Sequence, residues 1–251
     1  TYTVNYYWNG TTDKVAPSKT VDGQTFNAAV TESPIGVTGY TPVSADSKSL
    51  TIGTGTNEIN FYYYQNVTLT ANSDTATYDG KEHSVSGFTA SETAADFSAV
   101  TVGAKGTDVG TYDAKFAEDT VGTVDATAKY IVTEANNGAL TINPIDKVTV
   151  TIVGNSDSKL YNGEEQSVDG YTVTKISNPL YTEADFTFND NSNKTAKGID
   201  AGTYYMGLKA DQFTNTNKNF AEVEFIVTDG SLTITPRKVT LTSAADKKVY
   251  D

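Results

Sequence analysis

The chain has 251 residues and a formal net charge of −13, with one His, one Met, one Trp and no Cys. The lack of Cys excludes disulfides, thiolate metal ligands and cysteine nucleophiles. Acidic residues are spread along the chain, so the surface repels phosphate backbones and anionic membranes, and we expect no nucleic-acid partner. No stretch approaches 18 consecutive apolar residues, so we also expect no membrane insertion.

The composition predicts an all-β protein. Threonine is the most frequent residue, and 16 Tyr and 10 Phe accompany it. β-Branched and aromatic side chains suit a pleated, half-buried surface, whereas good helix formers such as Leu and Met are scarce here. The length allows two or three domains.

Residues 1–65 predict a small, mostly-β module of the β-grasp type. Apolar and polar residues alternate in a first strand over 2–8, and Asn9-Gly10 follows as a turn signal. A last strand over 59–64 alternates in the same way. Between them we expect one short helical turn over 25–30 and a strand over 39–43.

The rest of the chain repeats one order of sequence blocks. In the first copy these are 67–70, 78–80, 84–89, 95–97, 108–112 and 140–144; their counterparts are 148–151, 161–163, 167–172, 184–186, 200–204 and 232–236. A third copy starts at 239–242 and reaches Tyr250-Asp251. We therefore predict one repeat over 66–145, a second over 146–236, and the opening strand of a further repeat over 237–251.

Each repeat predicts an immunoglobulin-like β-sandwich. Tyr78-Asp79-Gly80 and Tyr161-Asn162-Gly163 are typical of tight hairpin turns. Pro144 and Pro236 end strands, since proline cannot donate to a ladder. Several short strands with turns every 8–12 residues describe such a sandwich.

Two family resemblances cover nearly the whole chain. The run Tyr2-Thr3-Val4-Asn5-Tyr6-Tyr7, with segments 15–20, 39–41 and 61–64, resembles the mucin-binding-protein (MucBP) repeat. That likeness implies a β-grasp-like module on a Gram-positive bacterial surface. The Tyr-Asp-Gly or Tyr-Asn-Gly start, Gly-Thr-Tyr middle and Leu-Thr-Ile-x-Pro end of the later copies resemble the YDG/MBG-type repeats of bacterial surface proteins.

The sequence offers no catalytic constellation, and we expect no enzyme activity, cofactor or metal. His83 is the sole histidine, and Gln166 stands at its place in the second copy, so we interpret it as an exposed loop residue. Recurring Asp96/Asp185 and Asp108/Asp200 precede strands and are interpreted as turn-holding residues. The cluster 189–193 carries oxygen ligands of the kind Ca²⁺ takes, but the first copy lacks it, which favours a surface loop.

The best ligand candidates are aromatic. Alternation sends Tyr7, Tyr62 and Tyr64 to one face of the N-terminal sheet, and Trp8 ends its strand just before a turn. Rings exposed in this way stack on sugars or protein partners. The alternative is that they cover the sheet or pack on the neighbouring module.

These observations predict a non-catalytic, monomeric fragment of a bacterial cell-surface protein, attached to the cell or its wall in the full-length parent. It would serve as a structural stalk and in adhesion to a host or cell-wall glycan or a surface protein. The alternative is an accessory carbohydrate-binding region of a secreted glycoside hydrolase.

Overall fold

The computed structural model describes residues 1–189 and 193–250 and confirms an all-β protein. Within these ranges the only helical segments are two 3-10 turns, η1 (Glu183–Asp185) and η2 (Ala210–Gln212). No helix in the described part of the chain is long and apolar enough to cross a membrane. The chain divides into two compact units, residues 1–76 with 81–143, and residues 77–80 with 144–251.

The first unit contains thirteen strands. They are β1 (Tyr2–Trp8), β2 (Lys14–Val21), β3 (Ala29–Glu32), β4 (Tyr40–Pro42), β5 (Lys48–Thr51), β6 (Glu58–Ala71), β7 (Asp74–Thr77), β8 (His83–Ser86), β9 (Phe88–Ala90), β10 (Gly103–Gly106), β11 (Gly110–Ala114), β12 (Tyr130–Asn136) and β13 (Gly138–Asn143).

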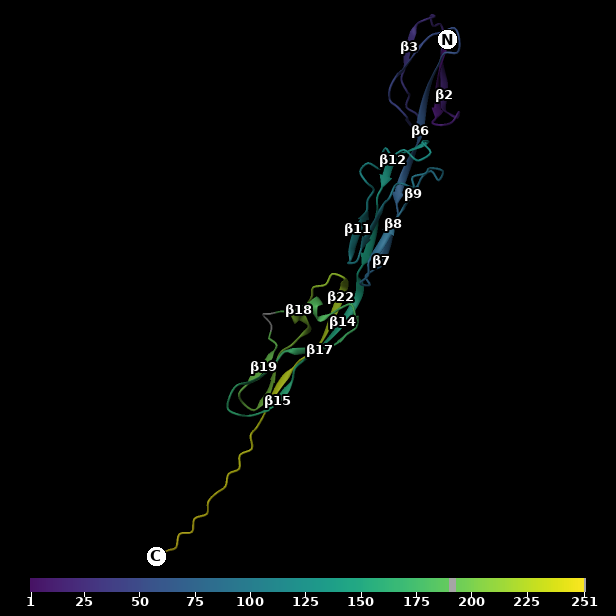
Figure 1. The fold of residues 1–251 in the computed structure, drawn as a ribbon. Helices are drawn as coiled ribbons and strands as arrows, with labels where there is room; N and C mark the ends of the chain where they lie inside the picture. Colours follow the sequence, from purple (N-terminus) through teal and green to yellow (C-terminus); the bar gives the residue numbers. More distant parts are fainter. Residues whose placement is uncertain (190–192, 251) are drawn as a thin grey trace. The chain divides into compact units, whose positions relative to one another are not determined.

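Strand β6 organises the first unit, as Figure 1 shows by the strands beside it. Its first half pairs in parallel with β1, and its second half pairs in parallel with β12. On the other edge β4 and then β9 pair with it in antiparallel fashion. The boundary that we predicted near Gln65 therefore falls inside one continuous strand of 14 residues.

The N-terminal module, residues 1–65, has its own core. Parallel pairing of β1 with β6 makes the first and last strands of the module neighbours, as expected of a β-grasp sheet. The buried residues of this core are Tyr2, Val4, Tyr6, Ile52, Ile59, Phe61 and Tyr63. The expected helical turn over 25–30 is wrong: Ala28 N–H donates to Thr25 O in a single turn, Asn27 has a φ of 61°, and β3 begins directly at Ala29.

In the first repeat, two three-stranded arrangements face a shared interior, β9-β6-β12 and β11-β13-β7, with β8 and β10 as an added pair. Most of its buried apolar residues fall into two small clusters, apart from Leu140 and Ile142 of β13. Val67, Leu69, Phe97, Tyr130 and Val132 form one, and Ala71, Val102 and Ala114 form the other.

The second repeat has the same strand order with more strands. These are β14 (Ile145–Gly154), β15 (Asp157–Leu160), β16 (Gln166–Asp169), β17 (Tyr171–Ile176), β18 (Phe186–Phe188), β19 (Thr195–Gly198), β20 (Gly202–Tyr205), β21 (Phe213–Asn215), β22 (Phe220–Thr228) and β23 (Ser231–Thr235). Sheets β17-β14-β22 and β15-β23-β20 enclose a single core rich in aromatic rings. Residues 77–80 belong to this unit, where the Tyr78 ring meets Phe220 edge-on at 5.9 Å.

The turn at Tyr78-Asp79-Gly80 is not a hairpin, contrary to the sequence prediction. Gly80 has a φ of 77°, so the turn itself forms as the sequence indicates. However, β7 pairs with β13 and β8 pairs with β10, so the turn carries the chain from one sheet to another. The second repeat repeats this arrangement around Gly163.

The Gly-Thr-Tyr motif is held by the same hydrogen bond in both repeats. The Tyr112 hydroxyl donates to Asp108 O at 2.8 Å, and the Tyr204 hydroxyl donates to Asp200 O at 3.0 Å. The Tyr112 ring covers Gly106, and the Tyr204 ring covers Gly198. A Cβ added to either glycine would lie within about 2.3 Å of the ring. The recurring Asp therefore lies in a turn that a tyrosine closes.

Residues 236–250 form no strand (Figure 1), and their side chains are exposed. The opening strand predicted over 237–251 is thus unpaired across the residues that the structure describes there. Strands β13 and β23 end at Asn143 and Thr235, directly before Pro144 and Pro236, as predicted.

Phe213→Ala is expected to destabilise the second repeat by about 3–5 kcal/mol, because its buried ring contacts Tyr171, Phe186, Phe188 and Phe225. Calorimetry would show one transition moving to lower temperature. Trp8, the sole Trp, lies in the other unit, so the transition followed by its fluorescence should stay in place. A matching shift in Trp8 fluorescence would contradict independent unfolding of the two units.

Candidate functional site

The outer face of the N-terminal sheet carries a pair of tyrosines side by side. Tyr7 and Tyr62 are partners in the parallel register of β1 and β6, and their ring centroids lie 6.1 Å apart. The Lys48 Nζ lies 5.5 Å from the Tyr62 ring centroid, where it adds a cation–π contact. Tyr62 is 38 % exposed and Tyr7 is half-buried. We call Tyr7, Tyr62 and Lys48 the outer strip.

Tyr64 lies further along the same face but outside this pair. Its backbone pairs with Thr41 of β4, and its side chain is half-buried. The alternation predicted for Tyr7, Tyr62 and Tyr64 agrees with burial, since Tyr6, Phe61 and Tyr63 on the opposite face are all buried. Ligand binding by these rings stays a prediction.

Trp8 faces the first repeat and makes protein contacts through both its ring and its N–H. Its Nε1 donates to Lys129 O at 3.0 Å, and its ring meets Tyr130 edge-on at 5.6 Å. Lys129 Nζ lies 5.5 Å from the Trp8 ring centroid. These contacts favour the alternative that this ring packs on the neighbouring module, while a ligand role for Trp8 stays untested.

A buried carboxylate shapes the loop that receives Trp8. Asp125 is 5 % exposed, and its Oδ1 accepts hydrogen bonds from the N–H groups of Lys129 and Tyr130, both at 2.9 Å. Its Oδ2 accepts the Thr127 hydroxyl at 2.6 Å and the Asp96 N–H at 3.2 Å. One side chain thus fixes the carbonyls that Trp8 and Asn9 use as acceptors.

The Asp125 carboxyl is strongly acidic. Burial by itself would raise its pKa, but the hydrogen bonds from Thr127, Tyr130, Lys129 and Asp96 outweigh burial and lower the pKa to about 2. The carboxylate is therefore ionised at every physiological pH, and all its bonds are to neighbouring loop groups. This arrangement holds a structure and does not supply an acid or base.

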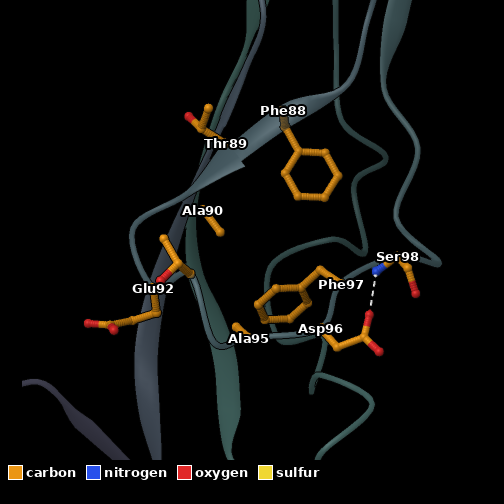
Figure 2. Close-up of a pocket in the computed structure, with 9 residues that line it drawn as sticks. Phe88, Thr89, Ala90, Glu92, Ala95, Asp96, Phe97 and Ser98 are labelled. Atoms are coloured by element: carbon orange, nitrogen blue, oxygen red, sulfur yellow. Dashed lines mark hydrogen bonds between the residues drawn. The ribbon is translucent and has the colours of Figure 1, made fainter.

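A pocket of about 530 Å³ opens in the first repeat, and the sequence analysis did not identify it. Figure 2 shows Phe88 and Phe97 directed into the same space, with the Glu92 and Asp96 carboxylates to either side of the Phe97 ring. Phe97 is buried, whereas Glu92 is half-buried and Asp96 is exposed. The volume of the pocket lies within the range of sites for small ligands.

The other candidate residues have structural surroundings. His83 begins strand β8 and is half-buried, so its assignment to an exposed loop is wrong. Asp185 holds a turn, as predicted, by accepting the Thr182 N–H at 2.7 Å. Residues 190–192 of the calcium candidate lie outside the described residues. In the remaining described ranges, no three His, Asp or Glu side chains gather as a metal site would require.

Comparison with known proteins bears on the second repeat. Residues 148–236 match the family model of the MBG domain, which suggests a surface-protein module. No curated protein matches the chain. A solved structure titled "The Bacillus anthracis TIE protein" aligns at 10 % identity and a TM-score of 0.19, over 80 % of this chain. The chain spans 41 % of that structure's chain, and a likeness of this size gives no basis for assigning fold or function.

Trp8→Ala is expected to lower the stability of the first unit by about 3 kcal/mol or more, because it removes a packed ring and leaves an acceptor unsatisfied. Trp8→Phe keeps an aromatic ring and loses the N–H bond, which costs about 1 kcal/mol. Calorimetry on both variants and on Tyr62→Ala, a partly exposed control, measures this order. A melting temperature for Trp8→Ala equal to that of Tyr62→Ala would contradict a packing role.

Asp125→Asn is expected to destabilise the first unit at pH 7 by on the order of 2 kcal/mol. The folded pKa lies below the unfolded value, so this stabilisation is present above about pH 4 and is lost as pH falls through about 2. The difference between wild type and variant in urea midpoint should therefore shrink from pH 4 to pH 2. A difference that stays constant across this interval would argue against an ionised Asp125 in the folded loop.

Proposed function

We propose that the chain is a non-catalytic region of an extracellular bacterial cell-surface protein, where tandem β-modules form a stalk and contribute to adhesion. The match of residues 148–236 to the MBG domain carries this proposal. The same blocks recur in residues 66–145, so the repeat unit is present twice in succession. Attachment to the cell wall of a Gram-positive parent belongs to the same proposal.

The outer strip is the adhesive surface of the N-terminal module in this proposal. Tyr7 and Tyr62 offer two neighbouring rings, and Lys48 offers a donor beside them. Aromatic faces stack on sugar rings while their hydroxyl tips remain hydrated. With the chain at a net charge of −13, a neutral glycan is favoured over sulfated or sialylated ones.

A second candidate is an accessory carbohydrate-binding region of a secreted glycoside hydrolase. The same outer strip supports it, since such regions also bind sugars through exposed rings. The two functions predict different ligands: a host or cell-wall glycan for adhesion, and a polysaccharide substrate for the hydrolase accessory region.

Tyr62→Ala is expected to abolish glycan binding with little change in melting temperature, because the side chain is partly exposed and lies on the outer face. A glycan array that includes host, cell-wall and plant polysaccharides should be probed with the full chain and with this variant. Tyr205→Ala, which removes a 70 % exposed tyrosine of the second repeat, is the matched control and should bind as wild type does. No bound glycan, or equal binding by both variants, would contradict the adhesive role of the strip.

A further inference from the structure

The two repeats can be compared residue by residue around the pocket, because the same backbone hydrogen bond marks both. Ala126 N–H donates to Asp96 O at 2.9 Å, and Thr216 N–H donates to Asp185 O at 2.8 Å. Counting from the shared Ala-Asp-Phe block places Glu92 at the position of Tyr181.

In the second repeat this position is filled by a ring. Tyr181 is buried, stacks on Phe186 with centroids 6.3 Å apart, and meets Phe220 edge-on at 4.9 Å. Its hydroxyl donates to Asp185 O at 3.0 Å. In the second repeat an aromatic ring with a polar tip therefore occupies this position.

A second ring of that core is also replaced in the first repeat. Phe213 lies between Tyr171 and Phe186, with ring centroids 5.1 and 6.0 Å away. Thr123 stands at its position, since Phe213 and Thr123 each lie three residues before the N–H donor of the shared hydrogen bond. Two of the rings that contact Phe213 remain aromatic, since Phe88 corresponds to Tyr171 and Phe97 to Phe186, whereas Ala99 stands at the position of Phe188.

The space between Phe88 and Phe97 thus corresponds to the space between Tyr171 and Phe186, which the Phe213 ring occupies in the second repeat. We propose that the first repeat binds an aromatic side chain of a partner protein between Phe88 and Phe97 (Figure 2). The inference rests on the adhesive part of the proposed function and deepens it by naming a second site and its ligand class.

The charge of the pocket determines which side chains we expect next to the aromatic residue of the partner. The pocket carries the Glu92 and Asp96 carboxylates and no basic side chain among its lining residues. Glu92 also lies near enough to Tyr130 to help burial raise the pKa of that phenol. A partner segment with Lys or Arg next to its Tyr or Phe complements these carboxylates. At about 530 Å³ the space accommodates the ring together with part of a neighbouring side chain.

The test is a titration of the full chain with acetyl-Lys-Tyr-Lys-amide, followed by amide shifts in the NMR spectrum. Acetyl-Lys-Ala-Lys-amide keeps the charges and removes the ring, and it should bind at least ten-fold more weakly. Shifts should centre on residues 88–98. Equal affinity of the two peptides would overturn the proposal, whatever any variant does.

Two variants of Glu92 distinguish the effect of filling the pocket with a ring from the effect of removing the Glu92 charge. Glu92→Tyr restores the ring of the second repeat, and it should raise the melting temperature and abolish peptide binding. Glu92→Gln removes the charge alone, and it should weaken binding several-fold and reduce its dependence on salt. Unchanged affinity in a folded Glu92→Tyr variant would place the peptide elsewhere and overturn the proposal.

A neutral disaccharide, N-acetyllactosamine, tests the competing occupant. Binding of this sugar at residues 88–98, in place of the tyrosine peptide, would overturn the proposal in favour of a glycan site. Loss of glycan-array binding in Tyr62→Ala with intact peptide binding would separate the outer strip from this pocket. The glycan-binding role of the outer strip and the peptide-binding role of the pocket are therefore tested separately.

Discussion

Everything in the first unit depends on one strand that serves two modules. Residues 58–63 of β6 are the last strand of the N-terminal sheet, and residues 65–71 are the first strand of the following repeat. Apolar residues continue along one face, from Ile59 to Ala71, with only Gln65 interrupting them. Because a strand cannot rotate about its own hydrogen bonds without breaking them, the register of one module fixes that of the next.

Sharing a strand brings the end of β1 against the start of β12, and the residues there complete the contact. Trp8 meets Tyr130, and the Asp125 carboxylate, which accepts the Tyr130 N–H, organises the loop whose Lys129 carbonyl accepts the Trp8 N–H. A buried carboxylate is costly unless its oxygens are fully bonded, and here both oxygens accept from backbone N–H groups. The contact between the end of β1 and the start of β12 is thus made by the Trp8 ring and by the loop that the Asp125 carboxylate holds.

The sequence predicted what depends on local chemistry and alternation. Side-chain periodicity predicts the opposite faces of Tyr6 and Tyr7. Residue composition predicts strands, and proline chemistry predicts where two of them end. The structure agrees with each prediction. The sequence also predicted that the first and last strands of the N-terminal module are neighbours, but not which strands pair within the repeats. The Asp-Gly turn indicates a reversal of the chain, but long-range packing decides whether the two flanking strands meet, and here they join different sheets. Trp8 likewise has partners about 120 residues away, which no local pattern reveals.

The pocket shows how a repeat becomes a site without gaining any catalytic group. A core that lacks a ring leaves packing contacts unmade, which destabilises the fold unless neighbours close in. In the first repeat the Phe116 ring packs edge-on against Phe88 at 5.8 Å, but a pocket remains between Phe88 and Phe97, where β9 and the loop after it are held by their own hydrogen bonds. Glu92, which stands at the position of Tyr181, places a carboxylate at the pocket, and this charge favours a partner ring that has a basic neighbour. Part of the signal for this pocket lies in the sequence, because the aligned blocks keep Phe88 and Phe97, whereas the match of Thr123 to Phe213 needs the backbone hydrogen bonds of the structure.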